Sequence, residues 1–67
     1  MVLEDWQHLV IVERDELAAK LEKIDSALLL GKAKSRLQID LLAVQRAAMT
    51  IYLKALNDRI DDFTKED

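Results

Sequence analysis

Apolar residues recur along the first half of the chain at helical spacing. The recurring positions are Leu3, Val10, Leu17, Leu21, Ile24 and Leu28. Such spacing places side chains on one face of an α-helix, which turns once in about 3.6 residues. The run from Leu9 to Val12 has the composition of a buried strand, but a strand there would interrupt the spacing and would have no second strand to pair with. We therefore predict one long helix, in which Leu9, Ile11 and Val12 point away from the main apolar face.

The second half of the chain carries two apolar rows at helical spacing. One row, the Leu42 row, consists of Leu42, Arg46, Met49, Leu53, Leu56, Ile60 and Phe63. The other, the Leu37 row, consists of Leu37, Leu41, Val44, Ala48, Ile51 and Ala55. At about 100° per residue, the two rows lie on different faces of a helix. A two-helix hairpin covers one row of each helix, so one row of the second helix is left for another partner.

The sequence between the two patterns contains signals that end one helix and begin another. Gly31 is the only glycine, and glycine commonly adopts the left-handed conformation just past a helix C-terminus. Ser35 and Gln38 match a capping box, in which each side chain binds a backbone N–H of the other residue. A short turn between helices favours antiparallel packing. We predict an all-α fold, an antiparallel two-helix hairpin of roughly residues 4–30 and 36–63, in a single domain of residues 1–67 whose acidic tail, residues 64–67, is frayed.

Composition indicates how so small a helical protein is stabilised. The chain has 67 residues, 51% of them apolar, and no cysteine. A chain of this length buries only about 60% of the surface that it exposes when unfolded, and no disulfide compensates for the small core. We therefore expect the hairpins to associate into a homo-oligomeric helical bundle. The expected interface residues are Trp6, Leu9, Val12 and the Leu37 row.

Charge and hydropathy limit the kinds of partner that we expect and the expected location of the protein in the cell. The 13 acidic and 10 basic residues give a net charge of −3, which differs from the basic surface of a DNA-binding protein. No apolar run reaches the roughly 18 residues of a membrane span. The acidic start "MVLEDWQ" lacks the basic region of a signal peptide. We expect a cytoplasmic protein that binds neither DNA nor a membrane.

The chemistry-bearing residues do not predict catalysis or a metal site. His8 is the only histidine and lies at the opposite end of the predicted hairpin from Ser35, so a serine nucleophile lacks a base within hydrogen-bond reach. Glu4 and His8 share a helix face, but the Glu-x-x-His pairs of metal sites in helical bundles are absent. Gly31 begins the segment "GKAKS", but a Walker loop needs an earlier glycine where this chain has Ser26. We expect no enzymatic activity, no metal and no cofactor.

Basic and aromatic residues interrupt the apolar pattern in the middle of the predicted hairpin. With the turn centred near residue 33, Lys20 is expected opposite Arg46, and Arg14 opposite Tyr52. Guanidinium groups bind phosphate oxygens in pairs, and aromatic rings stack on nucleobases. These four residues, with Arg59 as a fifth, are therefore the candidate contacts for a phosphorylated ligand that carries a base.

A purely structural interpretation of the two arginines is also open. Arg14 and Arg46 can lie along the core with their charged ends at its edge, because long basic side chains bury their stems and keep their heads in water. Their partners would then be the acidic residues Glu13, Glu16 and Glu22.

The residues on both predicted helices resemble those of a known group of proteins. The first helix carries Trp6, Gln7, Val10, Glu13, Glu16, Leu17 and Lys23, and the second carries Leu42, Gln45, Met49, Tyr52, Leu53, Leu56, Arg59, Ile60 and Phe63. This pattern resembles small phage and prophage helical-hairpin proteins, and its second half is similar to the hairpin of anti-CBASS and anti-Thoeris sponges. Those sponges sequester the cyclic nucleotide messengers of bacterial immunity without cleaving them. The resemblance implies a symmetric oligomer with ligand pockets between protomers.

Two functional hypotheses follow. The first is a phage-encoded protein of the host cytoplasm that associates with itself and sequesters a cyclic di- or trinucleotide, countering anti-phage signalling. The alternative is an oligomeric helical module for protein–protein interaction, a host-takeover or assembly factor that binds a host protein and no small molecule. The exposed Leu9, Ile11 and Val12 expected on the first helix motivate the alternative.

Overall fold

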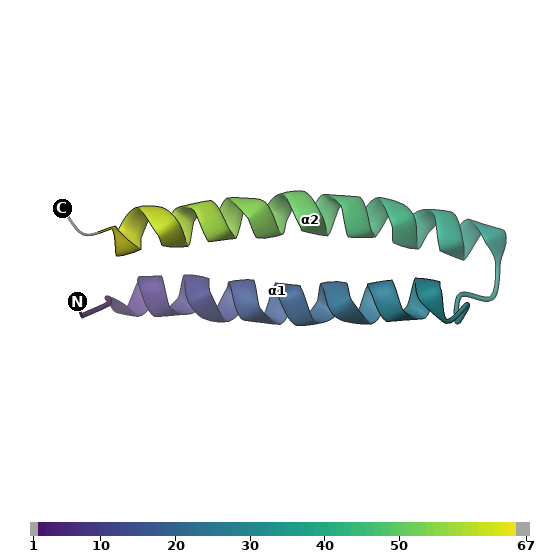
Figure 1. Cartoon of the computed structure of the whole chain (residues 1–67), viewed down its shortest axis with the longest axis horizontal. Helices are drawn as coiled ribbons and strands as arrows, with labels where there is room; N and C mark the ends of the chain where they lie inside the picture. The colour runs from purple at the N-terminus through teal and green to yellow at the C-terminus, as the bar shows by residue number, and fades with distance from the viewer. Residues whose placement is uncertain (1, 66–67) are drawn as a thin grey trace.

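Two antiparallel helices make up the fold (Figure 1). The computed structural model describes residues 2–65, with α1 at Asp5–Leu29 and α2 at Arg36–Thr64. The helices lie side by side along their whole length, so the two termini are at one end and the turn is at the other. The hairpin measures 49 × 16 × 15 Å. The predicted hairpin is confirmed, and three of its four helix ends agree with the prediction to within one residue while the fourth agrees fully.

The C-terminus of α1 is capped by a glycine in the left-handed conformation, as predicted from the sequence. Gly31 has a φ of 66°, in the left-handed region. The N–H of Gly31 donates to the carbonyl of Leu28 at 3.3 Å, and the N–H of Lys32 donates to the carbonyl of Ala27 at 2.9 Å. These two bonds form a Schellman motif, which satisfies carbonyl groups that the helix itself leaves without partners.

The N-terminus of α2 is capped by only half of the predicted capping box. Ser35 Oγ accepts a hydrogen bond from the backbone N–H of Gln38 at 3.1 Å. The return bond from the Gln38 side chain does not form among residues 2–65, because that side chain is exposed, where water can satisfy it. At the start of α1, by contrast, Gln7 Oε1 accepts the backbone N–H of Glu4 at 2.7 Å.

The first residue of the predicted frayed tail, Thr64, is helical. α2 continues through Thr64, whose hydroxyl donates to the carbonyl of Ile60 at 2.6 Å. This bond back to the preceding turn holds the last helical residue in place. Lys65 is not helical, and residues 66–67 lie outside the described part of the chain.

The core extends from the middle of the hairpin toward the termini. Its buried residues are Val10, Leu17 and Leu56, of which Leu56 is 0% exposed. Four partly buried residues of α2 pack against them, namely Met49, Leu53, Ile60 and Phe63. All belong to the rows predicted to form the core. Burying a leucine side chain contributes about 1.5–3 kcal/mol, so three buried residues make a small core.

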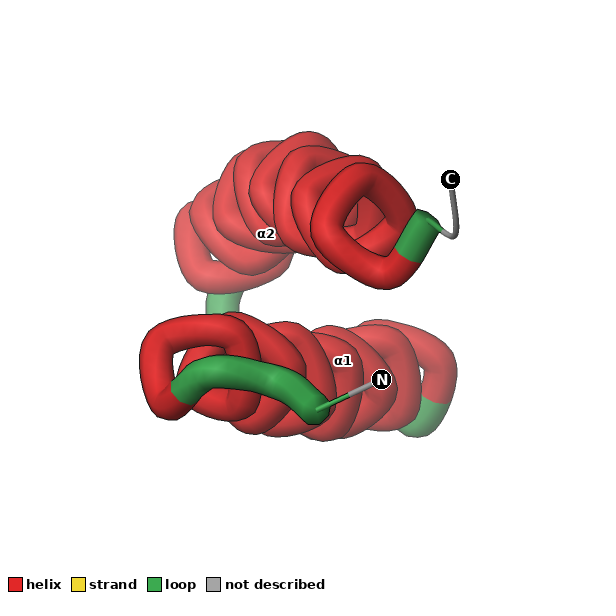
Figure 2. Tube along the Cα trace, turned by 90° about the vertical axis from the view of Figure 1, so that its left-hand side faces the viewer, coloured by secondary structure: helices red, strands yellow, loops and turns green. Residues whose placement is uncertain are grey.

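The Leu37 row lies on the outer side of α2, where nothing covers it. Figure 2, viewed along the hairpin, shows each helix with a neighbour on one side only. Val44 is 68% exposed and Ile51 is 73% exposed. The prediction that a hairpin covers only one row of its second helix is therefore confirmed for the single chain.

On α1, two of the three residues expected to point away from the core do so. Leu9 and Val12 are exposed. Ile11 is half-buried instead. Neither helix, in the stretch of chain described, is long and apolar enough to cross a membrane.

Candidate functional site

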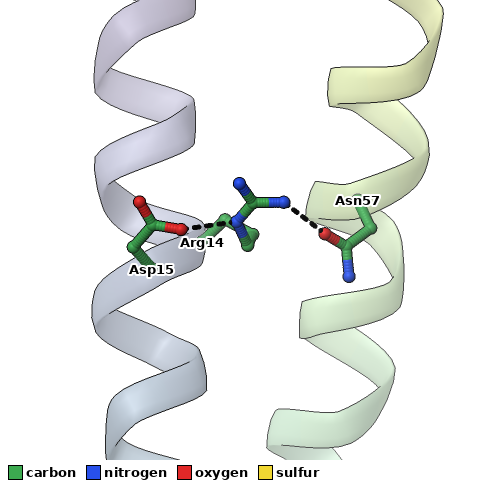
Figure 3. Close-up of polar contacts among 3 residues, drawn as sticks. All are labelled: Arg14, Asp15 and Asn57. Atoms are coloured by element: carbon green, nitrogen blue, oxygen red, sulfur yellow. Dashed lines mark hydrogen bonds and ion pairs between the residues drawn. The ribbon is translucent and has the colours of Figure 1, made fainter.

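Arg14 bridges the two helices near the middle of the hairpin. Its Nε–H donates to Asp15 Oδ1 at 2.7 Å, and its Nη1–H donates to Asn57 Oδ1 at 2.9 Å. Figure 3 shows the guanidinium lying between α1 and α2. Tyr52, which the sequence placed opposite Arg14, contacts the preceding residue Glu13 instead. The guanidinium is committed to one carboxylate and one amide within the chain.

Arg46 makes the second bridge between the helices. Its Nε–H donates to Asp25 of α1 in an ion pair. The sequence placed Lys20 opposite Arg46, but the ion-pair partner of Arg46 is Asp25. Lys20 is exposed and forms no ion pair with another residue of the described chain.

Both arginines reach partners beyond the residues expected opposite them, for the same physical reason. Side chains on a helix lean toward the N-terminus of their own helix, so a long side chain reaches past the residue opposite its Cα. Arg14 therefore reaches toward the termini, to Asn57 rather than Tyr52. Arg46 reaches toward the turn, to Asp25 rather than Lys20.

Tyr52 is also held by an acidic residue of α1. Its hydroxyl donates to a carboxylate oxygen of Glu13. This hydrogen bond is the main reason why the pKa of Tyr52 is raised above its ordinary value of 10.0, with smaller contributions from desolvation and from the charge of Glu13. The positive charge of Arg59 acts in the opposite direction and lowers the pKa of Tyr52, so Arg59 is electrostatically coupled to this ring.

Arg59 differs from the other arginines. Arg14, Arg36 and Arg46 each form an ion pair with an aspartate. Arg59 has no ion pair and no side-chain hydrogen bond to another residue of the chain between residues 2 and 65. Its five N–H donors are therefore available to a ligand.

A hollow of about 440 Å³ lies beside Arg59 at the open end of the hairpin. It is lined by Trp6, Asp58, Arg59, Asp62 and Phe63. The rings of Trp6 and Phe63 meet edge to face, with centroids 5.4 Å apart and planes at 79°. The Trp6 indole N–H donates to Glu4 Oε2 at 2.7 Å, which fixes the ring where it is 49% exposed. The sequence indicated Trp6 as an interface residue and Arg59 as a ligand contact, without a sign that they share a hollow, although antiparallel helices place residue 6 near residue 63.

The five predicted contacts do not form one cluster within a single hairpin. Arg46 and Arg59 are thirteen residues apart on α2, which corresponds to about 20 Å along a helix. Tyr52 lies between them, and Arg14 reaches across from α1. One ligand therefore contacts several of these residues only if it lies along the hairpin or if a second hairpin brings some of them to it.

The chain matches a known protein family. The sequence model of the Sequestin family matches residues 4–62, which include nearly all of both helices. Neither a curated protein nor a solved structure matches the chain. The family match confirms the resemblance to small phage hairpin proteins of the sponge type, and this chain belongs to the Sequestin family.

Proposed function

We propose that this protein sequesters a cyclic oligonucleotide messenger of bacterial immunity and does not cleave it. The match to the Sequestin family over residues 4–62 carries the proposal, because the family name denotes sequestration, which is a binding role rather than a catalytic one. The resemblance of both helices to phage sponges supplies the ligand class. By mass action, bound messenger is withdrawn from the host effector.

The free guanidinium of Arg59 is the first contact that we assign to the ligand. A phosphate that approaches Arg14 or Arg46 must displace an aspartate from the guanidinium, whereas Arg59 forms no ion pair among the described residues, although Asp58 and Asp62 line the same hollow. The exposed ring of Trp6 in the same hollow offers a surface on which a base can stack. The remaining candidates are those predicted from the sequence: Arg14, Lys20, Arg46 and Tyr52.

Self-association belongs to the proposal, because the candidates are too widely spread for one small ligand on one hairpin. The uncovered Leu37 row supports it, since an extended apolar surface on a soluble protein usually marks an interface. Pockets between protomers would then bring together residues that a single chain keeps apart.

The test is native mass spectrometry of the purified protein with a mixture of cyclic di- and trinucleotides. We expect the protein to gain the mass of one intact cyclic nucleotide and to release that nucleotide unchanged on denaturation. Arg59→Ala is expected to weaken binding of the retained nucleotide at least tenfold, whereas Lys23→Ala, an exposed basic residue outside the candidate set, leaves it unchanged. A protein that gains no nucleotide mass, or that returns a cleaved product, contradicts the proposal.

A second candidate function is a helical module that binds a host protein. The exposure of Leu9 and Val12 on α1 favours it, because the Leu37 row alone does not account for apolar residues on the other helix. Affinity capture from a bacterial lysate tests it. A stoichiometric host protein that is lost with Leu9→Lys, together with no bound nucleotide, supports the module and contradicts the sponge.

A further inference from the structure

The outer face of α2 carries a continuous row of exposed apolar residues at regular spacing. Its six residues, the Leu37 row, are spaced alternately by four and three residues over Leu37–Ala55. All six are exposed. Alternation of four and three is the spacing of a coiled-coil seam, which packs against another helix rather than against a flat surface.

The exposed area of the hairpin also indicates a missing partner. A compact monomer of 7.7 kDa has an accessible surface of about 4,300 Å², whereas this chain exposes 5350 Å². The excess is about 1,000 Å², close to the roughly 800 Å² that each partner contributes to a standard protein–protein interface. Association through one face would therefore reduce the accessible surface area of each chain to about that of a compact protein of this mass.

The charges beside the Leu37 row indicate which partner fits. Arg36, Asp40, Lys54 and Asp58 occupy one flank of the row, about 60–100° around the helix from its centre. Along α2 their signs run positive, negative, positive, negative. Read from Asp58 back to Arg36, the signs run negative, positive, negative, positive. A second α2 that lies antiparallel to the first therefore places an opposite charge beside each of these four residues.

We propose that the Leu37 row is covered by the Leu37 row of a second copy, with the two α2 helices antiparallel about a twofold axis. When the midpoints of the two Leu37 rows are aligned, Leu37 packs against the partner's Ala55, and Leu41 packs against the partner's Ile51. Val44 packs against the partner's Ala48 at the centre. Large residues thereby meet small ones in two of the three pairs, which allows the helices to approach closely.

The same register pairs the flanking charges. Arg36 faces the partner's Asp58, and Asp40 faces the partner's Lys54, and the twofold axis repeats each pair. In a parallel pair the charged flank of one helix would lie beside the opposite flank of the other, which carries the uncharged residues Gln38, Gln45 and Tyr52. None of these opposite-charge pairs would then form, so the charges favour the antiparallel arrangement.

The inference rests on the self-association contained in the proposed function, but not on its ligand. The dimer is therefore tested on the protein alone, without nucleotide. A dimer that binds no cyclic nucleotide refutes the sponge and leaves the interface standing, and a monomer that binds one does the reverse.

The first experiment exchanges charges between copies. We expect R36E and D58R, each alone, to dissociate on the order of tenfold more readily than the unmodified protein, as measured by analytical ultracentrifugation at low salt. An equimolar mixture of the two variants recovers association, because the mixed dimer restores an opposite-charge pair at both ends. K23E is the matched control, since Lys23 is exposed on α1 away from this face. An unmodified protein that is monomeric, or a mixture that recovers nothing, overturns the proposal.

The second experiment fixes direction and register. The described chain has no cysteine, so L41C and I51C each introduce a single thiol. Under mild oxidation the mixture of L41C and I51C is expected to form the mixed disulfide dimer, while each variant alone stays largely uncrosslinked. Efficient crosslinking of each variant to itself, with no mixed product, shows a parallel pair and overturns the antiparallel arrangement. Circular dichroism checks that both variants remain helical.

Discussion

Three side chains of α2 tie it to α1 through polar contacts. Arg46 pairs with Asp25, Tyr52 donates to Glu13, and Asn57 accepts from Arg14. These contacts lie at the exposed or half-exposed edge of the interface, where ion pairs contribute about 0–1 kcal/mol each. Their role is therefore to fix the register of the two helices, while the few buried apolar residues supply most of the stability.

The contact between Tyr52 and Glu13 predicts a dependence on high pH. Because the hydrogen bond raises the pKa of Tyr52 above 10.0 in the folded protein, the folded state keeps a proton that the unfolded chain loses. Its contribution to stability is complete below pH 10 and is lost as the pH rises through the folded-state pKa. Tyr52 is the only tyrosine, so the ultraviolet absorbance of its phenolate reports this pKa directly. Glu13→Gln is expected to move the titration back toward its ordinary position, and identical titrations of the two proteins would refute the contact.

At the scale of the elements, local sequence signals end α1 and begin α2 within one residue of the predicted positions. Gly31 and Ser35 act on the backbone within a few residues of themselves, so their effects can be read locally. The helices, the turn and the two faces of α2 were therefore predictable from the sequence. The partners of Arg14 and Arg46 were not, because they depend on the lean of long side chains across the interface. The hollow beside Arg59 was missed for a similar reason, since its walls come from both helices.

The turn offers a test of this local control. Gly31→Ala is expected to lower the free energy of unfolding by about 1–2 kcal/mol, because a Cβ disfavours the left-handed conformation. The cost is purely conformational, since an added Cβ at Gly31 meets no atom within 4 Å. Gly31→Asn is the matched control, and it is expected to lose less, because asparagine tolerates this conformation. Urea denaturation followed by circular dichroism measures both changes. Equal stability of the alanine variant and the unmodified protein would show that the Schellman motif does not hold the turn.

At the scale of the whole molecule, stability is concentrated toward one end. Val10 and Leu56 lie in the half nearest the termini and Leu17 lies at the midpoint of α1, whereas no described residue between 18 and 55 is buried. The whole Leu37 row lies within residues 18–55. A second copy that packs on the row would therefore stabilise the part of the hairpin that its own core supports least.

Amide hydrogen exchange at two protein concentrations tests this distribution. At low concentration we expect the slowest exchange around Val10–Leu17 and Leu56, and faster exchange in α2 near the turn, because local opening follows the number of buried contacts. At high concentration, protection is expected to rise along Leu37–Ala55, where association covers the apolar row. Ile51→Lys, at an exposed position of that row, is expected to abolish the rise while leaving exchange around Leu56 unchanged. A rise that persists in this variant would place the self-association on another face, and no rise in the unmodified protein would show that the hairpin stands alone.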